Sequence, residues 1–253
     1  MTITSQFNSE KTQHIPIVES HIFDGHEDAH FAVGAVAVDN KVINGYQEEF
    51  SGAAKLRANT YVDLGYVDSD DLDENGTELD LDDKRSIHFV VAEQIASEGL
   101  VRIVANMRLI AKTDSEPLPV ERFFPDVFTD IDVPEGSAEV SRLITRHENA
   151  RVQNLLKWPL FIAGLKHVDQ NGLGPVFGLL APTLTRSLVV QRVPVKPLAD
   201  AKYIEEINFT KQPVKIEVDR LRQVIDATGD QEIDISGSRF SYLKFDDAVS
   251  EDL

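Results

Sequence analysis

Charged side chains interrupt two stretches of this sequence that are otherwise apolar. Arg108 lies in NMRLIA, and Glu139 and Arg142 lie in AEVSRLIT. A buried charge is costly unless a partner of opposite sign meets it, and the densest supply of carboxylates is the run ELDLDD at 78–83. We therefore expect distant segments of the chain to fold around one sheltered cluster of opposite charges, which Arg57 can join from a helix.

The composition is that of an ordinary soluble globular protein. The chain has 253 residues, of which 42% are hydrophobic and 27% are charged. At this length about three quarters of the unfolded chain's surface is buried on folding, so one large domain fits. We expect a flexible, polar N-terminal arm at residues 1–20 and a single domain at 21–253 that ends in an acidic tail.

Several classes of protein are excluded by what the sequence lacks. It has no cysteine, which rules out disulfides, thiolate zinc sites and cysteine nucleophiles and favours a reducing compartment. It has no apolar run of about eighteen residues and no basic flank followed by an apolar stretch near its start, so we expect neither a membrane span nor a secretion signal. These features together predict a cytoplasmic protein.

The charge is unevenly distributed along the chain. The formal net charge of −18 opposes binding to nucleic acid and to anionic lipid. Between residues 139 and 202, however, bases outnumber acids. This basic island is either an ordinary solvated face or a docking surface for an anionic partner or a phosphate-bearing cofactor.

The spacing of apolar residues predicts the order of the secondary structure. Helical spacing is found at 50–66, 150–165, 175–190 and 220–227. Strand-like runs are found at 87–95, 100–111, 138–145, 203–209 and 214–218. The acidic stretch at 67–83 is expected to be a loop, because its like charges repel one another. This order predicts an α/β fold with a mixed β-sheet flanked by helices.

Short motifs between residues 50 and 200 occur in a familiar order. They are LR at 56–57, Tyr61, GY at 65–66, ELDLDD at 78–83, MRLI around Arg108, FFP around Phe124 and EVSR at 139–142. In order and spacing they resemble the acyl-homoserine lactone synthases and the related N-acyl amino acid synthases, which share the GCN5-related N-acetyltransferase (GNAT) fold. The resemblance implies a GNAT-like mixed sheet and an N-acyltransferase that moves a fatty acyl group from a thioester to a small-molecule amine.

The resemblance also implies roles for individual residues. It implies a buried electrostatic cluster that shapes the amine pocket, made of Arg57, Asp80, Asp83 and Arg108. Glu139 would be the general base, and Arg142 would steady either Glu139 or the neighbouring loop. Tyr61 and Tyr66 stand where the family usually has Phe and Trp. They keep an aromatic wall but add hydroxyl groups, so the acceptor stays open between S-adenosylmethionine, as in lactone signals for quorum sensing, and an amino acid.

The chemistry of amide formation also requires a carboxylate and hydrogen-bond donors at the site. An α-amino group attacks a thioester only as the neutral amine, so a carboxylate within reach must accept its proton. Glu139 is able to do this. Backbone N–H groups on a splayed strand can stabilise the thioester oxygen as charge develops on it. The alternative is that Glu139 and Arg142 form a buried ion pair with no catalytic role.

The donor side is indicated by the turn that follows the strand at 138–145. It reads RHENARVQNL and lacks the glycines with which CoA-dependent acetyltransferases of this fold bind pyrophosphate. Arg146, His147 and Arg151 are candidates to hold a single phosphate instead. This suits the phosphopantetheine arm of acyl carrier protein, an acidic partner that the family commonly uses, with acyl-CoA as the other donor. The alternative is an exposed helix start, and no tightly bound cofactor is implied.

An acyl chain also needs an apolar surface. Trp158 and Phe161 lie on the apolar face of the helix predicted at 150–165. In this fold such a face can line the tunnel that holds a fatty acyl chain, with Met107, Phe123 and Phe124 opposite. The alternative is that these side chains belong to the core alone.

Two other functions compete with acyl transfer. His26, Glu27 and His30 match the zinc-protease pattern HExxH, but DG precedes them and FAVGAVAV follows, which is strand-like rather than helical. Glu48 and Glu49 are the nearest third ligands. We expect a loop and no metal site here. The remaining alternative is a catalytically silent protein of the same fold that binds an acyl or anionic ligand.

Overall fold

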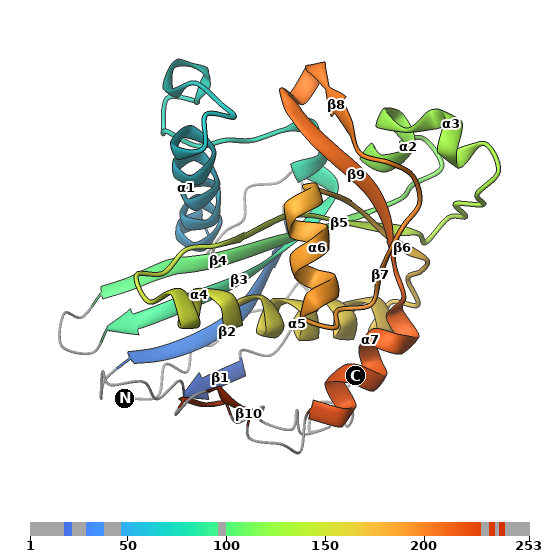
Figure 1. The fold of residues 1–253 in the computed structure, drawn as a ribbon. Helices are drawn as coiled ribbons and strands as arrows, with labels where there is room; N and C mark the ends of the chain where they lie inside the picture. The colour runs from blue at the N-terminus through green and yellow to red at the C-terminus, as the bar shows by residue number, and fades with distance from the viewer. Residues whose placement is uncertain are drawn as a thin grey trace, which may run out of the picture.

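The computed structural model describes residues 18–21, 29–37, 47–95, 100–228, 233–235 and 238–240. Within them the chain forms one large sheet with helices on both faces and a separate two-stranded sheet (Figure 1). The strand order in the large sheet is β1-β2-β3-β4-β5-β6-β9-β7, and β8 pairs with β9 beside this path. None of the helices in these ranges is long and apolar enough to cross a membrane.

The large sheet contains β1 (Val18–His21), β2 (Ala29–Ala37), β3 (Ser86–Ile95), β4 (Leu100–Ala111), β5 (Ala138–Thr145), β6 (Val176–Leu180), β7 (Val195–Pro197), β8 (Lys202–Ile204) and β9 (Phe209–Ile216). The small sheet pairs β10 (Ile233–Ile235) with β11 (Ser238–Phe240). The helices are α1 (Gln47–Asp63), α2 (Pro119–Phe123), α3 (Pro125–Phe128), α4 (Ala150–Leu155), α5 (Lys157–Gln170), α6 (Pro182–Val190) and α7 (Val218–Thr228), with 3-10 turns η1 (Ser69–Asp71), η2 (Leu81–Arg85) and η3 (Glu205–Ile207).

The pairing of strands in the large sheet changes between β5 and β6. These two strands are parallel, whereas the other neighbouring strands are antiparallel. Their ladder runs only from the pair Ala138–Val176 to the pair Val140–Gly178. Beyond it, β5 stays paired with β4, while Leu179 and Leu180 of β6 pair with β9 alone. The two strands therefore part in the middle of the sheet.

Each face of the sheet packs against its own apolar cluster, because side chains along a strand alternate between faces. In β6, Val176 and Leu180 belong to the cluster beneath α4, α5, α6 and α7. Phe177 and Leu179 belong to the cluster beneath α2 and α3. The second face also carries α1, which packs on β3, β4 and β5.

Most helices and strands before residue 170 lie where the sequence predicts them. The helix expected at 50–66 is α1, and Gly65 ends it in the left-handed region at φ 70°. The hairpin of β3 and β4 and the strand β5 lie where their apolar runs predict them. The helix expected at 150–165 is divided at Leu156 into α4 and α5. The acidic stretch at 67–83 is loop and 3-10 turn.

The helix predicted at 175–190 is wrong. Its first part is the strand β6, and the helix α6 begins only at Pro182. All residues of VFGLL are buried, because this strand is covered on both faces. Such a short apolar run has no alternation that would distinguish a strand from a buried helix.

The predictions after residue 200 are partly confirmed, and those for the first and last residues are mostly untested. The expected turn between strands 203–209 and 214–218 is wrong: the turn is η3 with Asn208 at φ 49°, and 210–213 lie within β9. The helix expected at 220–227 is confirmed as α7. Most of the predicted arm at 1–20 and the acidic tail lie outside the described residues, although Val18–His21 forms β1.

Candidate active site

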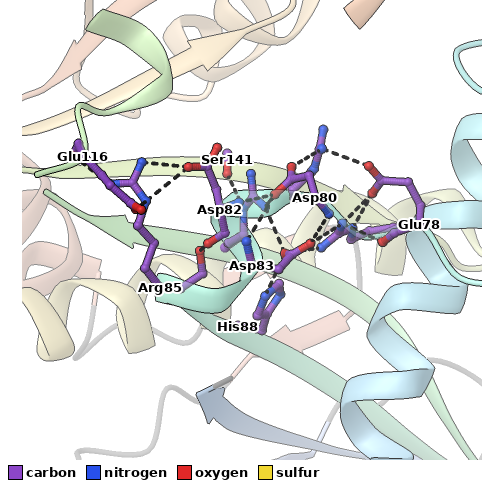
Figure 2. Close-up of polar contacts among 12 residues, drawn as sticks. Glu78, Asp80, Asp82, Asp83, Arg85, His88, Glu116 and Ser141 are labelled. Carbon is purple, nitrogen blue, oxygen red and sulfur yellow. Dashed lines mark hydrogen bonds and ion pairs between the residues drawn. The ribbon is translucent and has the colours of Figure 1, made fainter. Parts of the chain in front are cut away.

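The acidic loop and α1 are joined by a buried arginine. The side chain of Arg57 is fully buried, and its Nη1 donates to Asp83 Oδ1 at 2.7 Å. Its Nε donates to Glu78 Oε2 at 2.8 Å. Figure 2 shows Glu78, Asp80 and Asp83 close together, with His88 beside Asp83. The predicted meeting of distant opposite charges therefore occurs at this arginine.

The spacing D-x-x-D in the loop fixes its shape locally. Asp80 caps η2 by accepting from the N–H groups of Asp82 and Asp83 at 2.9 and 3.2 Å. Asp83 returns the contact by accepting from the N–H of Asp80 at 2.7 Å, which completes a capping box. The capping oxygen of Asp80, Oδ1, and the other oxygen of Asp83, also Oδ1, both contact β4, where Arg108 Nη1 lies 2.6 Å from Asp80 and 2.9 Å from Asp83.

Asp83 is held as an anion by its neighbours. Burial alone would raise its pKa, but hydrogen bonds from His88 and Arg57 and the charges of Arg57 and Arg108 bring the pKa of Asp83 far below its ordinary value. His88, whose Nε2 lies 3.2 Å from Asp83, is fully buried, and burial lowers its pKa. It is a packed residue of the cluster.

Arg142 reaches the cluster because its backbone is unusual. Glu139 and Ser141 of β5 face the acidic loop, so simple alternation would turn Arg142 to the other face. Arg142 instead adopts φ 54° beside a register shift between β4 and β5, and its Nη2 lies 2.6 Å from Asp80 and 2.9 Å from Glu78. Irregularities of this kind re-aim side chains at functional sites.

The contacts of Arg142 decide between the roles expected for it. Its guanidinium pairs with the acidic loop and lies 5.3 Å from the centroid of the Tyr61 ring. Burial lowers the pKa of Arg142, but the charges of Tyr61, Glu78 and Asp80 outweigh this and raise it. The alternative in which Glu139 and Arg142 form a plain ion pair is wrong, because the salt bridges of Arg142 run to Glu78 and Asp80.

Glu139 is the exception among these acids. It is 1% exposed, and Oε2 accepts a hydrogen bond of 2.7 Å from the N–H of Val120 at the start of α2. It forms no salt bridge within the part of the chain that the structure describes. Burial raises the pKa of Glu139 to about 7, and the Val120 N–H and the charge of Arg108 oppose this only in part. A carboxyl of this kind can exchange a proton near neutral pH.

These residues surround a cleft of 710 Å³. Its lining brings together the predicted residues Tyr61, Tyr66, Asp80, Arg108, Phe123, Glu139 and Arg142. Arg57 and Asp83 do not line it; they lie behind the lining and hold Asp80 and Arg108 in place. Tyr66 packs edge-on against Phe209 at 4.1 Å between ring centroids, which connects the chain after α1 with the hairpin of β8 and β9.

A second groove of 470 Å³ opens where β5 and β6 part. It is lined by residues 141–146 from β5 and beyond and by 179–181 from β6. The groove and the cleft share the lining residues Tyr61, Tyr66, Ser141, Arg142, Leu179, Phe209 and Lys211. The cleft and the groove therefore meet at these residues.

The three bases predicted for the donor side lie in different settings. Arg146 lines the groove and forms a half-exposed ion pair of 2.7 Å with Asp63. His147 is turned inward, with Nε2 3.2 Å from Glu93 and Nδ1 accepting from the N–H of Asn149. Arg151 is exposed in the first turn of α4, which Asn149 caps. His147 therefore anchors the turn rather than facing outward.

The five predicted acyl-pocket residues do not gather on one side of the sheet. Met107, Trp158 and Phe161 belong to the cluster beneath α5, where the rings of Trp158 and Phe161 lie 6.2 Å apart. Phe123 and Phe124 belong to the cluster beneath α2 and α3 on the other face. The expected arrangement with all five around one tunnel is corrected, because α5 carries Trp158 and Phe161 on one face of the sheet, whereas Phe123 and Phe124, at the end of α2, lie on the other.

The HExxH pattern does not form a helical zinc site in the described residues. His30 lies in β2, opposite His21 and Gln94, and His26 and Glu27 lie outside the described residues. Glu48 and Glu49 fall in the first turn of α1. Across the described ranges, no three potential ligands gather closely enough to hold a metal ion.

Sequence reasoning missed two residues of the site. Ser141 follows Glu139 at the strand period and accepts from Arg108 Nε at 2.9 Å, so alternation along β5 could have found it. Lys211 lies in TKQPVK, which resembles a polar turn; only the pairing of β9 with β6 and β8 brings it to the cleft.

Comparison with known proteins shows the fold. No family model matches the sequence, and no curated protein sequence matches it significantly. Among solved structures, a CoA-dependent acyl-homoserine lactone synthase, BjaI, with SAM and isopentyl-CoA matches at a TM-score of 0.56 and 18% identity over 77% of this chain and 88% of that one. The chain has the fold of the acyl-homoserine lactone synthases.

Other structures with this fold support the same conclusion. The CoA-dependent acyl-homoserine lactone synthase MesI matches at a TM-score of 0.55 and 17% identity over 79% of this chain and 96% of that one. FeeM, an N-acyl amino acid synthase from uncultured soil microbes, matches at 0.53 and 13% identity over 76% and 95%. The predicted GNAT-like α/β fold is confirmed. Because both kinds of synthase have it, the fold does not choose the acceptor.

Proposed function

We propose that this protein is an N-acyltransferase. It moves a fatty acyl group from a thioester, carried by acyl carrier protein or CoA, to the α-amino group of S-adenosylmethionine or an amino acid. With an amino acid the product is an N-acyl amino acid. With S-adenosylmethionine the carboxylate of the acylated compound must then attack its own γ-carbon and displace methylthioadenosine, which gives an acyl-homoserine lactone. The observation that carries the proposal is Glu139, a buried carboxyl outside any salt bridge in the described chain, in the wall of a cleft that meets a groove between two parting strands.

In this reaction Glu139 accepts a proton from the α-ammonium group of the acceptor, directly or through one water. The neutral amine then attacks the thioester carbon, the C–N bond forms, the C–S bond breaks and the thiol of the donor leaves with a proton. A pKa of about 7 suits this base, because it is ionised often enough to accept the proton at neutral pH. Arg57, Asp80, Asp83 and Arg108 hold the cleft in shape, and Arg142 fixes the acidic loop against Tyr61.

The groove between β5 and β6 is suited to the donor. Unpaired backbone groups where the two strands part can donate to the thioester oxygen. Leu143 and Leu184 line the groove and also pack against the cluster that contains Met107, Trp158 and Phe161. An acyl chain in the groove would extend toward those three residues. At the outer end, Arg146 and Arg151 would meet the phosphate of the donor.

The test is direct incubation. The purified protein is mixed with acyl carrier protein thioesters and acyl-CoA of several chain lengths and with a panel of amines that includes S-adenosylmethionine and amino acids. N-acyl products detected by mass spectrometry, absent without protein, are expected. If no product forms with any pair of donor and acceptor, the proposal is refuted. That result would favour a catalytically inactive protein of the same fold that binds an acyl or anionic ligand.

A further inference from the structure

Lys211 is placed at the point where the cleft and the groove meet. It lies near the start of β9 and lines both cavities. Its ammonium lies 4.5 Å from the centroid of the Phe209 ring. It makes no ion pair or hydrogen bond with any residue the structure describes. The side chain is half-buried, so its charge is only partly hydrated.

The arginines of the cleft differ from Lys211 in this respect. Arg108 is paired with Asp80 and Asp83, and Arg142 is paired with Glu78 and Asp80. Arg122, at the rim, is paired with Asp82. Their charges are already matched by fixed carboxylates. A ligand anion therefore gains most at Lys211, because that contact needs no existing ion pair to break.

We propose that Lys211 binds the carboxylate of the acceptor, so that the protein selects amines that carry a free α-carboxylate. This inference rests on the proposed function and names the substrate class of the same site. An α-amino acid carries its ammonium and carboxylate on one carbon, so the site must offer an acid and a base close together. Glu139 and Lys211 line the same cleft and form such a pair, one for each charge of the acceptor.

The electrostatics of the cleft favour this placement. Most of the other ionisable lining residues are acids, including Asp68, Asp71 and Glu206, which would repel a carboxylate elsewhere. Burial and the charge of Arg142 lower the pKa of Lys211 to about 8, and Glu139 offsets this only in part. A carboxylate bound at Lys211 would supply the missing opposite charge and stabilise the ammonium form.

The experiment compares matched acceptors in matched variants. Lys211→Met, Lys211→Arg and the control Lys215→Met are each assayed with α-amino acids and with the corresponding α-amino amides, which keep the amine and lose the carboxylate charge. Lys215 lies on the same strand, is exposed and lines neither of the two cavities. Binding of each acceptor without donor is also measured by calorimetry.

Lys211→Met is expected to lower kcat/KM for the acids by about ten- to a hundredfold, mainly through KM, and to leave the amides within about threefold. Lys211→Arg should restore much of the loss, and Lys215→Met should change neither. Equal losses for acids and amides would overturn the inference and assign Lys211 to the donor. No loss for either, or calorimetry showing equal acid binding by wild type and Lys211→Met, would also overturn it.

The calorimetric arm separates this inference from the proposed function. If the wild type binds amino acids through Lys211 but forms no product, the acyl transfer fails and the carboxylate site stands. If products form and the acids keep their rates in Lys211→Met, the transfer stands and the carboxylate site fails.

Discussion

Two groups of residues that line the cleft treat charge in opposite ways, and we name them the paired end and the unpaired end after their contacts. At the paired end, formed by Glu78, Asp80, Arg108 and Arg142, each ionised side chain contacts one or more partners of opposite sign. At the unpaired end, formed by Glu139 and Lys211, neither residue has a salt bridge among the described residues. A substrate gains little by binding at the paired end, because each charge there already has a partner of opposite sign. The unpaired end is where a substrate can contribute the missing partner.

The pKa values follow the same division. Asp83, behind the paired end, has a pKa far below its ordinary value because His88, Arg57 and Arg108 outweigh its burial. Glu139 is buried to a similar degree without such partners, and its pKa is raised to about 7. Burial alone therefore does not decide the state of a carboxylate in this protein; the neighbouring cations do.

The largest effect is expected at the unpaired end. Glu139→Gln should reduce N-acyl product formation by about 10²- to 10⁴-fold, because the amide cannot accept the proton of the acceptor amine. The far-ultraviolet spectrum should be preserved and the urea midpoint should not fall, since Gln can still accept from the N–H of Val120 and carries no charge that burial would penalise. Single-turnover rates measure the change, and a loss of less than threefold would remove Glu139 as the base.

The next effect concerns the paired end and stability. Arg57→Met should lower the free energy of unfolding by about 3–5 kcal/mol, because Glu78, Asp80 and Asp83 then share only Arg108 and Arg142, which leaves one unmatched negative charge in a buried cluster. Urea denaturation measures it. Arg222→Met, which removes an exposed ion pair with Asp169, is the control and should change the midpoint little. Similar midpoints for the two variants would show that the cluster is not structural.

A pH dependence of stability should distinguish the two ends. The folded-state pKa of Glu139, about 7, lies above its ordinary value of 4.5, so the native state keeps a proton that the unfolded state loses between these values. The free energy of unfolding of the wild type should therefore fall, relative to Glu139→Gln, by about 3 kcal/mol as the pH rises from about 4.5 to 7. Parallel curves for the two proteins would contradict the raised pKa.

The smallest effect is expected at the donor turn. Arg146→Ala and Arg151→Ala should each raise the KM for the thioester donor by about two- to fivefold at low salt, with little change in kcat, because exposed charges act mainly on association. Lys196→Ala, another exposed base of the same island, is the control. A KM that is unchanged by either variant at low ionic strength would remove the donor role from this turn.

Sequence alone could predict the paired end, because burying Arg108 and Arg142 in apolar strands requires acids, and ELDLDD supplies them. It could also place Glu139, since β5 is a clear apolar run. The position of Arg142 on the same face was not predictable from alternation, because it depends on a left-handed backbone at φ 54°.

The rest of the site depends on contacts that are distant in the chain. The segment VFGLL is apolar throughout, so its pattern fits a buried helix as well as a strand. Without the strand β6, the sequence does not locate the groove between β5 and β6. Lys211 lies in a polar segment whose strand character comes from its pairing with β6 and β8. The division of the predicted acyl pocket between two faces follows from the packing of α2 and α5 on opposite faces of the sheet, which residue type does not reveal.

The central claim is that Glu139 is a buried, unpaired carboxyl poised to exchange a proton near neutral pH. Carbon-detected nuclear magnetic resonance of protein labelled in its glutamate side chains, with Glu139→Gln to assign the signal, measures this directly. The account predicts that the Glu139 carboxyl carbon titrates at about pH 7. A midpoint near the ordinary glutamate value of 4.5 would contradict it.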